Sequence, residues 1–187
     1  MTRKISFAPD EYYHVYNRGT DKRVIFPNHK DSERFLALLY LANTDDSVHL
    51  GNYQGSTLME FLSLERGKPL INIGAYCLMP NHFHLLIKER DPEGLSIFMQ
   101  KLMTGYTMYF NKKYERTGTL FEGKFKARHV DDDTYLNYLF AYIHLNPLKI
   151  IDQNWKENGI KDVRKSKKFL SEYKHSSYDH YIKGKQP

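Results

Sequence analysis

The hydrophobic residues of this chain follow two different periods, and the period changes several times along the sequence. Runs rich in Tyr, Ile, Val and Phe, with apolar and polar side chains in alternation, are typical of strands. Segments in which apolar side chains recur every three or four residues are typical of amphipathic helices. The first pattern predicts strands at residues 11–18, 70–79, 81–87 and 119–130. The second predicts helices at about residues 31–42, 58–64, 94–114 and 131–145.

Residues suited to begin a helix stand at the start of three of these segments. Asp31 or Ser32 can cap the first helix, because its side-chain oxygen can accept a hydrogen bond from a free backbone N–H. Thr57 and Glu60 have the spacing of a capping box. The aspartates at 131–133 place negative charge at the start of the last helix, where the helix dipole favours it.

A turn signal at Pro80–Asn81 separates two of the predicted strands. Residues 70–79 and 81–87 are therefore expected to pair as an antiparallel hairpin. Residues 43–69 read as an insertion between core elements, and no internal repeat or domain boundary interrupts the order. Strand, helix, two strands, helix, strand and helix together predict an α+β fold, with one antiparallel sheet covered by helices.

The strand after this turn carries two histidines on one face. Side chains alternate along a strand, so His82 and His84 point the same way, with Cα atoms about 6.6 Å apart. Phe83, Leu85 and Ile87 point the other way and can anchor the strand in a core. The two imidazoles can converge on one metal ion, although two histidines form an incomplete site and can also be purely structural.

The composition of the chain predicts what kind of partner the protein binds and in which cell compartment it is found. The 187 residues carry a formal charge of +6 and include 15 Tyr and 11 Phe, which suits a nucleic acid because phosphates need counter-charges and bases stack on rings. A tyrosine-rich core in a basic protein is the alternative. Cys77 is the sole cysteine, no apolar run is long enough to span a membrane, and the first residues lack the apolar segment of a signal peptide. These features predict a cytoplasmic protein.

Two stretches offer contacts to such a nucleic acid. In the predicted strand 119–130, Lys124, Lys126 and Arg128 share one face, which makes a phosphate-tracking surface possible, whereas the alternative is an ordinary solvated face. Asn17 and Arg18 follow the first strand and are expected to contact DNA, with a structural role in the turn as the alternative.

The last predicted helix offers groups that can complete the metal site. Tyr142 and Asn146 are four residues apart and so share a helix face, although Pro147 disfavours a helical conformation at Asn146. Tyr142 also fits an apolar helical stripe, and Tyr138 is a second candidate nucleophile one turn away. His14, on the first strand, can reach the site if that strand neighbours the histidine strand, but a core position is the simpler interpretation.

Four stretches of the chain resemble the motifs of one protein family, in the family's order. These are residues 13–19, 79–86, 116–125 and 142–147, with the sequences YHVYNRG, MPNHFHLL, RTGTLFEGKF and YIHLNP. Over about residues 11–150 the chain therefore resembles the HUH superfamily, and within it the single-tyrosine transposases of the REP-associated group. The resemblance implies a ferredoxin-like fold in a domain of residues 1–150, followed by a basic extension, residues 151–187, packed on the same domain.

The resemblance also implies an activity and its residues. His82 and His84 correspond to metal ligands, Tyr142 to the nucleophile, and Asn146 to the amide that supplies a third ligand. Phosphate and amide oxygens beside imidazole suit Mg²⁺ or Mn²⁺. The implied reaction is metal-dependent endonuclease and strand-transfer chemistry on single-stranded or hairpin DNA, through a 5′-phosphotyrosine intermediate. Relatives act as monomers or as homodimers.

Two other functions compete with this one. A non-catalytic or domesticated nucleic-acid-binding protein of the same fold predicts hairpin binding without metal dependence or cleavage. A zinc-dependent hydrolase using the same histidines and a bound water predicts cleavage without a covalent adduct and without dependence on Tyr142.

Overall fold

Four antiparallel strands form the sheet at the centre of the computed structural model, which describes residues 6–47 and 57–184. The strands lie in the order β2-β3-β1-β4. Their bounds are β1 (Tyr12–Arg18), β2 (Ile71–Met79), β3 (His82–Glu89) and β4 (Lys126–Val130). β2 and β3 form the expected hairpin around Pro80–Asn81, and β1 pairs with β3 on one side and β4 on the other.

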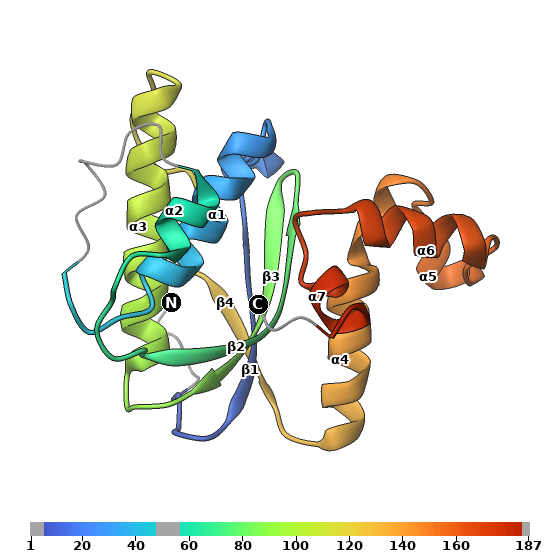
Figure 1. Cartoon of the computed structure of the whole chain (residues 1–187), viewed down its shortest axis with the longest axis horizontal. Helices are drawn as coiled ribbons and strands as arrows, with labels where there is room; N and C mark the ends of the chain where they lie inside the picture. Colours follow the sequence, from blue (N-terminus) through green and yellow to red (C-terminus); the bar gives the residue numbers. More distant parts are fainter. Residues whose placement is uncertain (1–5, 48–56, 185–187) are drawn as a thin grey trace.

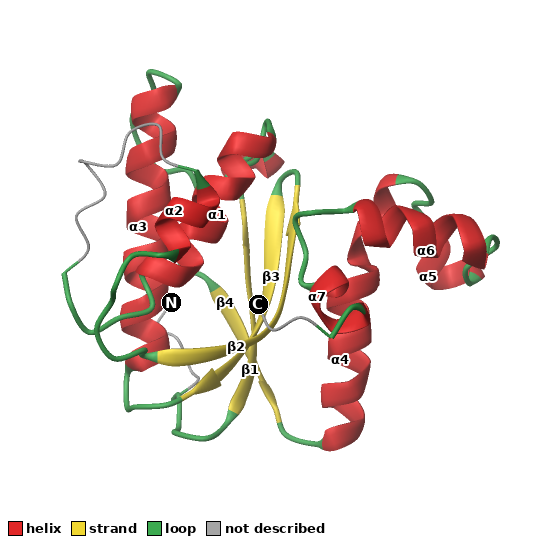
Figure 2. Ribbon diagram, in the orientation of Figure 1, coloured by secondary structure: helices red, strands yellow, loops and turns green. Residues whose placement is uncertain are grey.

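Helices cover both faces of this sheet (Figures 1 and 2). One face carries α1 (His29–Leu41) and α3 (Gly94–Lys113), with α2 (Leu58–Leu62) packed on α1, and the other carries α4 (Asp133–Leu145) and α7 (Tyr178–Ile182). α6 (Val163–Glu172) packs on α7, and α5 (Trp155–Asn158) and α6 extend away from the sheet. Two 3-10 helices, η1 (Thr20–Lys22) and η3 (Asn146–Ile150), follow β1 and α4. The order β1-α1-β2-β3-α3-β4 around a sheet with this strand order is the ferredoxin-like arrangement, so the predicted α+β fold is confirmed. No helix among the described residues is long and apolar enough to cross a bilayer.

The alternation along β3 divides the interior into two cores. Phe83, Leu85 and Ile87 are fully buried in the larger core, between the sheet and helices α1 and α3. On the other face, Leu86 belongs to the core under α4, together with Leu139 and Ile143 of that helix. The histidine strand is thus held by hydrophobic packing on both of its faces.

Several helix ends follow the sequence signals. Asp132 caps α4 by accepting a hydrogen bond from the backbone N–H of Tyr135, and the capping box of Thr57 and Glu60 begins α2. The 43–69 segment falls partly outside the described residues. At the end of α4, Asn146 is helical despite the proline that follows it, and the chain continues as η3.

The cap predicted for the first helix was wrong. α1 begins at His29 with Asn28 as its cap, whose side-chain oxygen accepts a hydrogen bond from the N–H of Asp31 at 3.2 Å. Asp31 lies in the first turn of the helix and is buried. Its carboxylate accepts hydrogen bonds from Tyr109 and Lys113 of α3 and from Tyr114, the residue after α3. Its carboxylate therefore joins α1 to α3.

The strand predicted for 119–130 is also shorter than expected. The ladder with β1 begins only at Lys126, and Phe121 makes an isolated bridge to Gly19. Between them Gly123 has a φ of +65°, a left-handed conformation that breaks an extended strand. Phe121 and Phe125 still pack on the larger core, so the alternating apolar pattern arose from this loop's packing as well as from a strand.

The burial of Phe83 behind the histidines makes a prediction about stability. Phe83→Ala should lower the free energy of unfolding by roughly 3–5 kcal/mol, because it removes a fully buried ring and leaves a cavity. Urea denaturation followed by circular dichroism measures the loss. The control is Met108→Ala on α3, where the side chain is 68% exposed and the change should stay within about 0.5 kcal/mol. Equal effects of the two substitutions would contradict this picture of the core.

Candidate active site

Three histidines gather on the sheet face that α4 covers. In the β1–β3 ladder Tyr16 lies opposite His84, and residues opposite each other in a ladder share a face. His14 is two residues before Tyr16 on β1, so it points to the same face as His84. The ring centroids of His82 and His84 are 5.1 Å apart, and those of His14 and His84 are also 5.1 Å apart. The sequence predicted the first pair, whereas His14 was assigned by preference to the core. Its neighbour relation to His84 depends on the strand order, which brings β1 beside β3.

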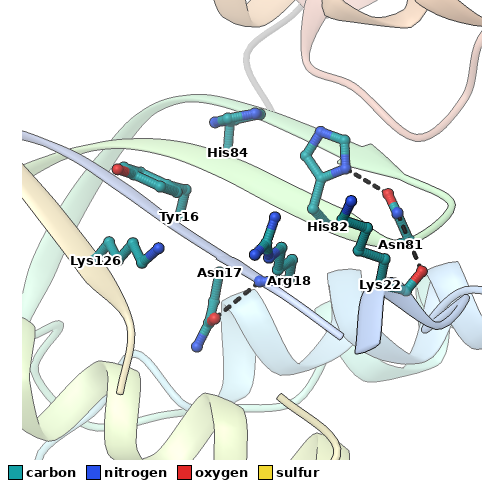
Figure 3. A pocket seen from close by; sticks show the side chains of 8 residues that line it. All are labelled: Tyr16, Asn17, Arg18, Lys22, Asn81, His82, His84 and Lys126. Atoms are coloured by element: carbon teal, nitrogen blue, oxygen red, sulfur yellow. Dashed lines mark hydrogen bonds between the residues drawn. The ribbon is translucent and has the colours of Figure 1, made fainter. Parts of the chain in front are cut away.

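Hydrogen bonds hold one ring nitrogen of each predicted ligand. His82 Nδ1 donates to the side-chain oxygen of Asn81 at 2.6 Å (Figure 3), and His84 Nδ1 lies 2.9 Å from His14 Nε2. A histidine that donates from Nδ1 has its lone pair on Nε2, where it can bind a metal. When His84 donates from Nδ1 to His14 Nε2, the lone pair on its own Nε2 is free.

Burial keeps these imidazoles uncharged. Desolvation, with a smaller contribution from Arg128, lowers the pKa of His14 to about 4. Desolvation lowers the pKa of His82 to about 4 and that of His84 well below its usual value, and the ammonium of Lys149 lowers both further. At neutral pH the imidazoles carry free lone pairs, which is the form that ligates a metal.

Tyr142 lies beside these histidines in the same chain. Its ring centroid is 5.5 Å from that of His84 and 6.4 Å from that of His14. It is presented by α4, which packs on β2 and β3 through Leu139 and Ile143. Tyr138, the other candidate, stacks on the far side of Tyr142 and is 50% exposed. The structure thus brings Tyr142 to the histidine face and leaves Tyr138 one turn farther away along the helix.

Asn146 has the features of an amide that lacks its ligand. Its side chain is fully buried, and neither its oxygen nor its nitrogen has a hydrogen-bond partner among the described residues. An unpaired buried polar group costs about 1–3 kcal/mol, so an amide in this state is suited to bind something else. No group of three His, Cys, Asp or Glu side chains within residues 6–47 and 57–184 can hold a metal ion. The amide oxygen of Asn146 is an oxygen donor of another type that has no hydrogen-bond partner in the described part of the chain.

Two lysines that the sequence analysis did not single out stand over the Tyr142 ring. Lys149 Nζ is 5.9 Å and Lys156 Nζ 5.2 Å from its centroid. They come from η3 and α5, so the residues after α4 contribute positive charge to the site. Lys149 follows Tyr142 by seven residues, which is two helical turns. That spacing was the one sequence signal for Lys149. It places Lys149 beside Tyr142 because the helical backbone continues past Pro147.

A cavity of about 330 Å³ opens next to the histidines (Figure 3). Its walls are Tyr16, Asn17, Arg18, Lys22, Asn81, His82, His84 and Lys126. Arg18 forms an ion pair with Glu122, with Nη2 3.0 Å from Oε1. Asn17 is 3% exposed and donates from its amide to the carbonyl of Gly123 at 3.2 Å, so its contacts are those of the turn residue that the sequence left as the alternative.

The three predicted cations of the 119–130 segment separate into two groups. Lys126 lies opposite Tyr16 and Arg128 opposite His14, which places both on the histidine face of the sheet. Lys124 precedes the strand in the bend around Gly123 and is exposed there, so it is not in register with the other two. The expected row of three cations along one strand is therefore wrong, and two of them face the site.

The lowered pKa values predict how stability depends on pH. The unfolded chain takes up protons on His14, His82 and His84 below about pH 6.5. In the native protein burial lowers the pKa of His14 and His82 to about 4 and that of His84 well below its usual value. The free energy of unfolding should fall from pH 6.5 to pH 4, by up to roughly 1.4 kcal/mol per pH unit for each histidine. Urea titrations in EDTA measure this slope, and His14→Gln should make it shallower by one proton. An unchanged slope in His14→Gln would show that His14 titrates normally.

Comparison with known proteins agrees with this geometry. Residues 10–146 match the family model of IS200-like transposases. A solved structure of a REP-associated tyrosine transposase bound to a REP hairpin has a similar fold, with a TM-score of 0.59 and 12% identity over 100% of this chain and 88% of that one. No curated protein matches the chain by sequence. Since the family model spans most of the chain and both the tyrosine helix and the histidine strand, this protein belongs to the IS200-like transposase family.

Proposed function

We propose that this transposase cuts and rejoins single strands of DNA through a covalent bond to Tyr142. The observation that carries the proposal is the position of the Tyr142 ring, 5.5 Å from that of His84 within one chain. The unpartnered amide of Asn146 supports it, because it lies one helical turn after the tyrosine. A protein that only binds DNA has no need for this combination of groups.

The chemistry requires a phosphodiester beside the tyrosine. The phenolic oxygen of Tyr142 bonds to phosphorus, and the bond from phosphorus to the 3′ oxygen breaks. The phenol loses its proton to solvent, and the departing oxygen takes one up, which leaves a 5′-phosphotyrosine and a 3′-hydroxyl. Attack of a 3′-hydroxyl on the phosphotyrosine reverses the step and joins two strands without an external energy source. The ammonium groups of Lys149 and Lys156 lie over the Tyr142 ring, where they can offset negative charge on the phosphate during the attack.

The donor set is suited to a divalent cation. His82 and His84 supply Nε2 atoms and Asn146 an amide oxygen, and with phosphate oxygens from DNA this mixture suits Mg²⁺ or Mn²⁺. Such an ion polarises the scissile phosphate and offsets developing negative charge. The protein's own contribution is to hold the donors rigidly, on a strand packed on both faces and on a helix end.

The DNA partner follows from the cavity beside the histidines. Lys22, Lys126 and Arg18 line it or its rim, and Arg128 lies farther along the same sheet face, so phosphates can be neutralised up to the site. Lys124 is exposed beside this path. The similar transposase structure is bound to a REP hairpin, and we extend that class of substrate, a hairpin with a single-stranded flank, to this protein. Because Tyr142 meets histidines of its own chain, one monomer holds the groups that the reaction needs.

Removal of the Tyr142 hydroxyl tests the nucleophile. Tyr142→Phe should abolish the covalent protein–DNA adduct formed with a hairpin oligonucleotide and Mn²⁺, because the ring remains but the attacking oxygen is gone. Denaturing gel electrophoresis of a 3′-labelled strand detects the adduct, because the fragment with the original 3′ end stays bound to the tyrosine. Tyr138→Phe should still form it. Adduct formation by Tyr142→Phe, with loss in Tyr138→Phe, would assign the reaction to Tyr138.

Metal removal separates the proposed reaction from the other two functions. EDTA should stop adduct formation, Mn²⁺ or Mg²⁺ should restore it, and Asn146→Ala should weaken Mn²⁺ binding measured by calorimetry, by about tenfold or more. Asn146→Asp is the matched variant, since it keeps an oxygen donor at that position. Cleavage without an adduct indicates the hydrolase, and hairpin binding without cleavage in any metal indicates a pure binding protein.

A further inference from the structure

Three tyrosines of α4 form a continuous stack that ends at the candidate nucleophile. The rings of Tyr135 and Tyr138 have centroids 6.3 Å apart and planes inclined by 21°. The rings of Tyr138 and Tyr142 have centroids 6.1 Å apart and planes inclined by 15°. Spacings of three and four residues place all three on one side of the helix. We call Tyr135, Tyr138 and Tyr142 the tyrosine ladder.

The middle ring of the tyrosine ladder is not used by the fold. Tyr135 and Tyr142 pack partly against the core under α4, but Tyr138 belongs to no hydrophobic cluster of the described residues and is 50% exposed. The exposed face of this ring is therefore available to a partner.

Cations accompany the tyrosine ladder along its length. The guanidinium of Arg128 lies 4.3 Å from the centroid of Tyr135. Lys156 Nζ lies 5.9 Å from the centroid of Tyr138 and 5.2 Å from that of Tyr142, where Lys149 also lies. These positive groups come from β4, which precedes α4 in the chain, and from η3 and α5, which follow it. Asp131 and Asp132 precede α4 and Asp133 begins it, so the first turn of the helix is acidic.

We propose that the tyrosine ladder and its cations bind the single-stranded DNA next to the scissile phosphate, with bases stacked on Tyr138. The inference rests on the proposed function, since the ladder leads directly to Tyr142. Exposed rings interleaved with cations match a single strand, which offers unpaired bases and phosphates at once. A duplex stem hides its base faces and needs only the cations. The exposed ring of Tyr138 and the continuity with the cleavage site both favour the single strand.

The test compares a strand that has bases with one that has none. Fluorescence anisotropy in EDTA measures the binding of the full chain to labelled oligothymidine and to an abasic strand of equal length. Tyr138→Leu should weaken oligothymidine binding by about 5- to 100-fold, because a base–aromatic stack is lost. It should leave abasic-strand binding unchanged, and Tyr138→Phe, which keeps the ring, should bind both strands like the original protein. Lys156→Ala should weaken both strands alike.

A second measurement needs no substitution. A strand carrying 5-iododeoxyuridine should cross-link under ultraviolet light to the peptide that contains Tyr138, as mass spectrometry of the digested protein can show. Absence of this cross-link, or equal weakening of both strands by Tyr138→Leu, overturns the inference. So does unchanged oligothymidine binding in Tyr138→Leu. If the base-dependent binding is found but the unsubstituted protein forms no adduct, the proposed function fails and the binding surface stands.

Discussion

The alternation of side chains along β3 is the constraint on which the site depends. Phe83, Leu85 and Ile87 fill the larger core, and this burial forces His82 and His84 onto the opposite face. A slip of one residue in the register of β3 would place the polar imidazole rings of His82 and His84 in that core and the phenyl ring of Phe83 in the site. The hydrophobic energy that fixes the strand therefore also fixes the donors. Loops position side chains less rigidly, because little apolar surface holds them.

The site also needs the helix that carries Tyr142 to lie beside the histidine strand. α4 packs on β2 and β3 through the smaller core and so takes this position. Leu139 and Ile143 face the sheet, Tyr142 lies beside the ring of His84, and Asn146 is buried at the end of the helix. The helical backbone then continues into η3, which carries Lys149 to the same place. One docked helix thus supplies the phenol, the amide and part of the positive charge, and its exposed side carries the remaining tyrosines.

Burial and charge act together on these groups. Desolvation keeps the three histidines neutral, and nearby cations reinforce that state, so a region with several basic side chains still contains uncharged nitrogen donors. Lys126, Lys149 and Lys156 form no ion pair with another described residue, so their positive charge remains around the histidines and Tyr142. The site thereby combines neutral imidazole nitrogens with an electrostatic environment that suits an anion.

The sequence alone predicted the elements and the chemistry that local patterns encode. These are the hairpin, the paired histidines, the helix with Tyr142 and Asn146, and the α+β class. Periodicity and turn residues are local, which is why they were readable. The tertiary structure decided the contacts that form only where separate strands and helices pack together. It placed His14 against His84, committed Asn17 to the Gly123 turn, separated Lys124 from Lys126, and brought Lys149 and Lys156 over Tyr142. Those contacts join residues far apart in the chain, and their geometry follows from strand order and helix docking, which no short stretch of sequence contains.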